Sequence, residues 1–127
     1  MSRREVKVPG RPVLAHAADA VEADGLLFVA GLLPVDPDGA LVGPGSASEQ
    51  ARFVLEELAR VLDAAGRSAA DLVKANVYVT AREAVGPVER AWHEVLGVGG
   101  VAVTTVVVPA LAIAGAEVEV DAVAGRA

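Results

Sequence analysis

Acidic side chains alternate with apolar ones near the end of the chain, where residues 116–123 read AEVEVDAV. In an extended segment of this period, Glu117, Glu119 and Asp121 fall on one side. A carboxylate beside a substrate can orient a water molecule or act as a general base. The other interpretation is that the three acids are only the polar face of an alternating strand. The pattern alone leaves both interpretations open.

Few other side chains have types and spacings that carry chemistry. The chain has no cysteine, which excludes disulfides, thiolate metal sites and a cysteine nucleophile. The two histidines, His16 and His93, lie far apart in the sequence without clustered acids, so no metal site is predicted. The region 31–45 contains several glycines but lacks the Lys-Ser/Thr ending of a phosphate-binding loop.

The composition indicates one domain over residues 1–127, with 54% hydrophobic and 3% aromatic residues. Its core is therefore expected to consist of valine, leucine and alanine. The net charge of −6 argues against nucleic acid as a partner, because phosphates require a basic patch. The first residues lack the apolar segment of a signal peptide, and no apolar run approaches the roughly 20 residues of a membrane span. We expect a cytoplasmic protein with no membrane partner.

The stretch 46–66, SASEQARFVLEELARVLDAAG, has the clearest helical pattern. Apolar side chains recur at the i, i+3, i+4 spacing of a helix that buries one face, and charged side chains occupy the other face. Ser46 and Glu49 have the spacing of a capping box, and Gly66 suits the left-handed position after a helix. Glu56 and Arg60 predict an i, i+4 ion pair.

Strands and a second helix are predicted around this first helix. The second helix is expected over about residues 85–96, and strands over residues 4–8, 17–21, 26–30, 72–79, 101–108 and 116–123. In the fourth strand, one side is expected to carry Val73, Ala75, Val77 and Val79. Two helices cannot cover both faces of a sheet of five to six strands. The predicted fold is therefore α+β, with both helices packed on one face and the other face buried by oligomerisation.

Four segments together resemble the RidA/YjgF family of reactive-imine deaminases, also described as endoribonuclease L-PSP. They are GLLFVAGLLPVDPDGALVG, EQARFVLEELARVLDAAG, DLVKANVYVT and the closing EVEVDAVA, and the resemblance covers about residues 13–124. It implies a chorismate-mutase-like fold and a homotrimer with a small-molecule cleft between each pair of subunits. It also implies hydrolysis of enamines or imines derived from amino acids, releasing ammonia and a 2-keto acid with no metal or organic cofactor.

Several positions of the implied cleft differ from the family pattern. The family's arginine, whose guanidinium binds the substrate carboxylate, corresponds to Val103, which cannot bind a carboxylate. Its tyrosine and serine correspond to Ala17 and Ala30, and its asparagine corresponds to Glu89. Glu119 matches the glutamate of the closing E-x-E motif and is the candidate catalytic residue, with the polar-face interpretation equally open.

Four further features concern substrate binding. Thr105 lies two residues beyond Val103 on the same side of the strand and either bonds a ligand or simply fills a strand position. Leu32 extends the apolar lining of the implied cleft. His16 precedes the position of the missing tyrosine and either supplies a polar group there or lies at the surface. A second acid, Glu89, would repel a carboxylate substrate.

Two functions remain open from the sequence. The first is a divergent RidA-like hydrolase that acts on a neutral or bulkier enamine, imine or related labile metabolite, a tailoring reaction included, rather than on 2-iminobutanoate. The second is a non-catalytic trimer that binds a small ligand or serves as a scaffold, which the loss of polar cleft residues favours. An apolar cleft suits an apolar ligand in either case.

Overall fold

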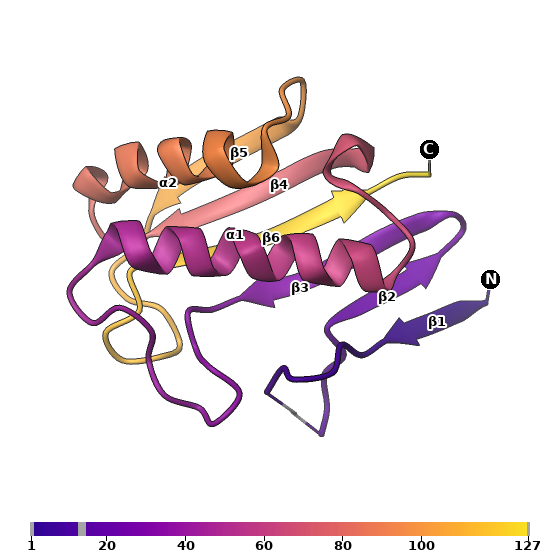
Figure 1. Cartoon of the computed structure of the whole chain (residues 1–127), viewed down its shortest axis with the longest axis horizontal. Coiled ribbons are helices and arrows are strands. Elements are labelled where there is room, and N and C mark those ends of the chain that lie inside the picture. Colours follow the sequence, from indigo (N-terminus) through magenta and orange to yellow (C-terminus); the bar gives the residue numbers. More distant parts are fainter. Residues whose placement is uncertain (1, 13–14, 127) are drawn as a thin grey trace.

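One sheet of six strands runs through the protein, in the order β1-β2-β3-β6-β4-β5. The computed structural model describes residues 2–12 and 15–126. The strands are β1 (Arg3–Val6), β2 (Ala20–Ala23), β3 (Leu26–Leu32), β4 (Leu72–Val79), β5 (Ala102–Val107) and β6 (Val118–Ala124). All neighbours pair antiparallel except β4 and β5, which are parallel. Helices α1 (Ala47–Ala64) and α2 (Val85–Ala91) lie side by side on one face (Figure 1), which confirms the predicted α+β architecture.

Helix α1 forms where the apolar stripe predicted it. Ser46 caps its start, because the Oγ atom accepts a hydrogen bond from the Glu49 backbone N–H at 3.1 Å. In a full capping box the Glu49 side chain would also accept a hydrogen bond from the Ser46 N–H. Here the Ser46 N–H donates instead to the Gly43 carbonyl at 2.9 Å. Gly66 follows the helix with a φ of 72°, the left-handed conformation that glycine adopts at least cost. The buried apolar face consists of Ala51, Val54, Leu55, Leu58, Val61 and Leu62.

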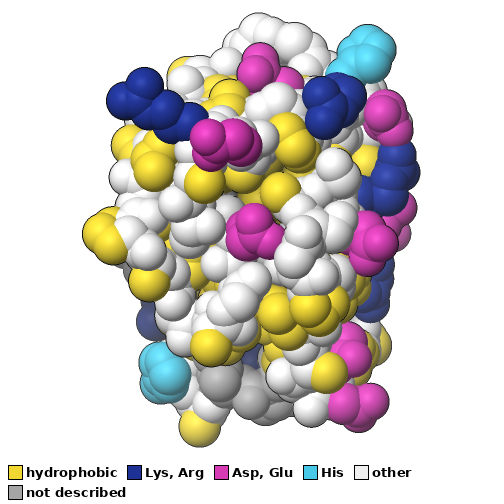
Figure 2. Space-filling model, turned by 90° about the vertical axis from the view of Figure 1, so that its left-hand side faces the viewer, with side chains coloured by type: hydrophobic (Ala, Val, Ile, Leu, Met, Phe, Trp, Pro, Cys, Tyr) yellow, Lys and Arg dark blue, Asp and Glu magenta, His cyan; other side chains and the backbone are white. Residues whose placement is uncertain are grey.

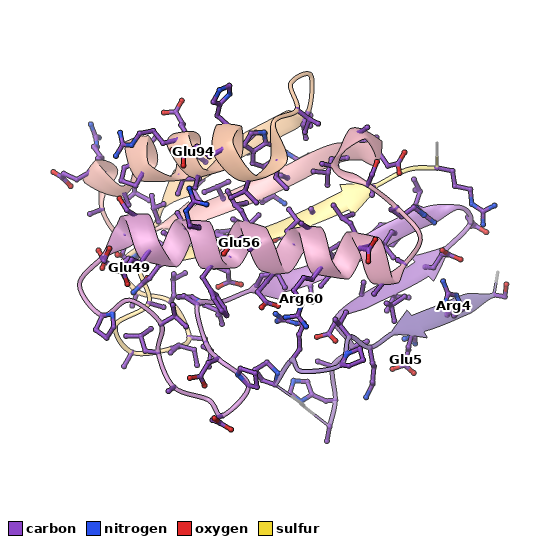
Figure 3. All side chains as sticks on the ribbon, viewed as in Figure 1. Arg4, Glu5, Glu49, Glu56, Arg60 and Glu94 are labelled. Atoms are coloured by element: carbon purple, nitrogen blue, oxygen red, sulfur yellow. The ribbon has the colours of Figure 1, made fainter. Side chains whose placement is uncertain are left out.

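The charged face of α1 pairs differently from the prediction. Arg60 bonds Glu57 at 2.8 Å and the Pro9 carbonyl at 2.8 Å rather than Glu56, and it extends from α1 toward the N-terminal segment (Figure 3). Glu56 instead lies 3.9 Å from Arg52. The buried Glu57 carboxylate is thus shared between Arg60 and Arg11, which lies 2.7 Å from it.

The second predicted helix forms in two parts. Helix α2 continues as a π-turn, η3 (Trp92–Leu96), in which the Gly97 N–H donates to the Trp92 carbonyl. Gly97 then ends the helix with a φ of 64°. The Trp92 indole N–H donates to the Val98 carbonyl at 2.8 Å, which fixes the ring at this end of the helix.

Strands β1 and β2 are displaced from their predicted positions. The pairing starts at Arg3 opposite Ala23 and ends at Val6 opposite Ala20. The Val8 N–H does not continue the ladder, because it donates to the Asp19 carboxylate at 2.7 Å. This side-chain bond takes the Val8 N–H out of the ladder, so β1 ends at Val6, and β2 consists of the residues that face Arg3–Val6.

The two faces of the sheet differ in how deeply they are buried. The helix side is buried and contains Ala75, Val77 and Val79 of β4 as predicted. Val73 is an exception with 49% exposure, because the β4–β6 register shifts between Leu72 and Lys74 and Leu72 takes the buried place. On the other side of the sheet the described residues carry no covering element, and Phe28 of β3 is 46% exposed there.

Gln50 joins the start of α1 to two loops and gives the first prediction. Its fully buried amide donates to the carbonyls of Gly43 and Gly115 and accepts from the Glu117 N–H at 2.7 Å. Gln50→Leu leaves the Gly115 carbonyl and the Glu117 N–H without this partner, while the Gly43 carbonyl keeps the Ser46 N–H, so the free energy of unfolding in urea is expected to fall by about 2–4 kcal/mol. The exposed variant Glu56→Gln serves as control, with an expected change within about 0.5 kcal/mol. An equally small change for Gln50→Leu would contradict the assignment.

Candidate functional site

A pocket of about 370 Å³ between α2 and β5 brings together three of the predicted site residues: Glu89, Val103 and Thr105. The parallel ladder sets Val103 beside Ala75 and Thr105 beside Val77, so both point to the helix side of the sheet. The other described lining residues are Val77, Val85, Val88 and Trp92. The pocket is therefore largely apolar, with Glu89 and Thr105 as its polar side chains.

A second pocket, of about 180 Å³, contains three more of the predicted residues: Ala17, Ala30 and Leu32. It lies between β3 and the segment before β2. His16 is exposed and is not among the described residues that line this pocket. The predicted binding residues of one chain thus divide between two separate pockets.

Arg11 is the basic side chain among the described residues that line the second pocket, and its guanidinium is already paired with two acids. Its guanidinium bonds Asp19 at 2.9 Å and Glu57 at 2.7 Å. All three side chains are largely buried, and Glu57 also binds Arg60 at 2.8 Å, so two acids are matched by two arginines. A carboxylate ligand would therefore have to compete with two acids that already bind this guanidinium.

Glu119 lies on the open side of the sheet, where β6 pairs it with Tyr78 of β4. Its carboxylate packs over Gly31 of β3, and a Cβ atom at Gly31 would collide with it. Gly31 also lines the second pocket, so the acid lies at the margin of that pocket. Burial, and secondly the neighbouring charge of Asp121, raise the pKa of Glu119 above its ordinary value.

Sequence reasoning missed a polar cluster beside Glu119. The Asp121 carboxylate accepts hydrogen bonds from the Asn76 amide and the Tyr78 hydroxyl, both at 2.8 Å. The bond to Asp121, and then burial, raise the pKa of Tyr78. Alternation placed Asn76 and Tyr78 on one side of β4, but the β4–β6 register that aligns them with the acids is a property of the fold.

This arrangement supports acid–base chemistry. A carboxyl group with a raised pKa can both accept and donate a proton closer to neutral pH than an ordinary glutamate. Thr104 does not contribute, since it faces away from Val103 and its hydroxyl bonds the Lys74 ammonium at 2.9 Å. In the described part of the chain, no three His, Asp or Glu side chains gather into a group that could hold a metal ion.

The surface at one end of the molecule combines apolar and acidic side chains. Figure 2 shows the end where the loop before α1 and the loop after β5 lie, with hydrophobic side chains over much of the face, acidic side chains both near the middle and along the right-hand edge, and basic side chains nearer the edges. Over residues 2–12 and 15–126, no helix is long and apolar enough to cross a membrane.

The fold and the sequence together define a family. Residues 11–125 match the family described as endoribonuclease L-PSP, which covers most of the chain. The structure of YyfA from Yersinia pestis, a Rid-family protein of unknown function, superposes with a TM-score of 0.89 at 28% identity, over 98% of this chain and 99% of that chain. The chain belongs to the endoribonuclease L-PSP family, which confirms the resemblance to RidA/YjgF proteins.

Curated relatives extend this comparison. The mitochondrial protein mmf2 of Schizosaccharomyces pombe is 35% identical over 109 residues, which are 84% of this chain and 85% of mmf2. The 3-aminoacrylate deaminase RutC of Acinetobacter baylyi is 35% identical over 68 residues, which are 54% of each protein. The chain thus matches about half the length of that deaminase.

The raised pKa of Glu119 predicts how folding stability depends on pH. Because the folded state holds the proton more tightly, this group's stabilising contribution is complete below about pH 4.5, the ordinary value, and is lost as the pH rises through the raised pKa. Glu119→Gln should therefore be more stable than the wild type at neutral pH and show a smaller loss between pH 4.5 and 7. The free energy of unfolding, measured with urea between pH 4.5 and 7, tests this prediction, and Glu117→Gln serves as the control variant. Parallel curves for Glu119→Gln and the wild type would contradict the assignment.

Proposed function

We propose that this protein is a divergent imine or enamine hydrolase in which Glu119 is the general acid and base. The observation that carries the proposal is the position of Glu119, partly buried beside Gly31 with a raised pKa. Deaminase activity in the relative from Acinetobacter baylyi supports the reaction class. We further propose that the protein works in the cytoplasm.

The proposed site is a cleft between two subunits of a homotrimer. Glu119 lies on the open side of the sheet, whereas Val103 and Thr105 lie on the helix side. These three residues of one chain therefore cannot contact the same ligand. A neighbouring subunit that places its α2–β5 pocket against the Glu119 margin would bring the two halves together. The exposed Leu26 and Phe28 provide apolar surface that such contact would bury.

The proposed reaction needs only water and one carboxylate. Glu119 takes a proton from water as the water oxygen bonds to the carbon of a protonated imine, and the C=N π electrons move to nitrogen. Protonated Glu119 then donates this proton to the amine nitrogen of the carbinolamine. The C–N bond breaks as a lone pair of the hydroxyl oxygen forms C=O, and the hydroxyl proton leaves with the ammonia as ammonium. One imine cation and one water thus yield one carbonyl compound and one ammonium ion.

The loss of the carboxylate-binding arginine limits the substrate. With Val103 at that position and Glu89 in the same pocket, we propose that 2-iminobutanoate and 2-iminopropanoate are not substrates. The second candidate function is a non-catalytic trimer that binds a small ligand. The predominantly apolar lining of the α2–β5 pocket favours it.

A set of imines that differ in charge, generated in situ by oxidases, tests the hydrolase. We expect no acceleration with 2-iminobutanoate and faster ammonia release with at least one imine that has no carboxylate. Glu119→Gln should lower that rate by about 100-fold or more, because it removes general acid–base catalysis. Glu117→Gln, at the residue just before β6, should leave it unchanged. An active Glu119→Gln variant would overturn the role of this residue.

Gly31→Ala offers a second readout of the same carboxylate. The new methyl group must displace the flexible Glu119 side chain, so activity should fall while the fold is retained. Gly99→Ala is the matched control, since a Cβ there meets no atom within 4 Å among the described residues.

Light scattering tests the assembly. Three chains of 12.8 kDa give about 38 kDa, and we expect this mass for the wild type. Phe28→Glu introduces charge on the open side of the sheet and should shift the mass toward that of one chain, whereas Glu56→Gln on α1 should not. A wild-type mass of one chain would contradict the inter-subunit site.

A further inference from the structure

The charged side chains around the two pockets indicate the sign of the charge on the ligand. In the α2–β5 pocket the charged residue among the described lining is Glu89. In the second pocket, Arg11 is bound by Asp19 and Glu57. At the margin of that pocket lies Glu119, whose carboxylate packs over the lining residue Gly31. Glu89 and Glu119 are therefore the acids at the two pockets that have no ion-pair partner among the described residues.

The α2–β5 pocket also has the shape and lining for an apolar body. Its volume of about 370 Å³ is within the range of small-molecule sites, and Val85, Val88 and Val103 supply aliphatic surface. The Trp92 ring lies in the same lining and is fixed by its bond to Val98. An aromatic ring and a carboxylate in one pocket favour a cation over an anion.

Glu89 is placed to act as the counter-ion. It lies on the last part of α2, exposed toward the pocket opening, and it forms no ion pair within residues 2–12 and 15–126. A positive ligand group would gain from this carboxylate, whereas a carboxylate on the ligand would be repelled by it.

We infer that the cleft recognises the protonated imine of an apolar amine, a ligand with an aliphatic body, a positive charge and no carboxylate. This inference rests on the proposed hydrolase function, because it names the substrate class of the same site. Such an imine arises when an aliphatic primary amine is oxidised. Its hydrolysis proceeds by the same addition of water and cleavage of the C–N bond, and it yields an aldehyde and an ammonium ion. The reaction that supplies the substrate is thus an amine oxidation rather than an amino-acid oxidation.

Calorimetric binding of two stable probes of similar shape and opposite charge tests the recognition. Isopentylammonium stands in for the protonated imine, and 4-methylpentanoate is its carboxylate counterpart. We expect the wild type to bind the ammonium and not the carboxylate, with affinity that falls as salt is added. Glu89→Gln should weaken ammonium binding by roughly two- to fivefold, as expected for an exposed ion pair. Glu83→Gln, which removes the same charge outside the pocket lining, should leave it unchanged.

Each result decides the inference. Tighter binding of 4-methylpentanoate, binding of neither probe, or ammonium binding that is insensitive to Glu89→Gln would overturn it. Hydrolysis of the imine formed from isopentylamine by an amine oxidase separates the two proposals. Glu89-dependent ammonium binding without hydrolysis would support the recognition and refute the hydrolase. Accelerated hydrolysis of 2-iminobutanoate would support the hydrolase and refute the recognition.

Discussion

Burial of the apolar stripe of α1 against the sheet is the constraint on which the rest of the structure depends. Its valine and leucine side chains are almost completely inaccessible, and each such burial stabilises the fold by about 1.5–3 kcal/mol. The helix contacts β3 and β6 at the centre of the sheet, as well as α2. The helix side of every central strand must therefore be apolar, and polar chemistry is left to the other side or to the sheet edge.

This division explains where the candidate chemistry lies. Side chains alternate along a strand, so β6 can bury Val118 and Val120 and still present Glu119 and Asp121 on the open side. Gly31 lets the Glu119 carboxylate lie against the backbone of β3, where partial burial raises its pKa. The edge strand β5 leaves Val103 and Thr105 in a pocket beside α2. The proposed catalytic acid and the α2–β5 pocket thus lie on opposite sides of one sheet, which is why the proposed site contains residues of two subunits.

The charges around the two pockets underlie the proposed preference for a ligand without a carboxylate. Arg11 is largely buried, but Asp19 and Glu57 already use its charge to hold the N-terminal segment against α1. That network stabilises the second pocket without presenting a free cation. The acids that remain near a ligand, Glu89 and Glu119, have no basic partner among the described residues. The family fold constrains the strands and helices, whereas the charges of the proposed cleft depend on individual side chains such as Glu89.

The sequence by itself determined the elements whose signals are local. The stripe and caps of α1, the extent of β4 and the alternation of β6 follow from side-chain spacing over a few residues, and family resemblance supplied the fold. Tertiary structure alone decided the shift of β1 and β2, the exposure of Val73 and the partners of Arg60 and Glu57. It also decided the Asn76–Asp121–Tyr78 cluster, whose hydrogen-bonded partners are 45 and 43 positions apart, and the pKa of Glu119, because strand register and burial bring distant residues together. Such long-range contacts depend on how the whole chain packs, and no local pattern of residue types encodes them.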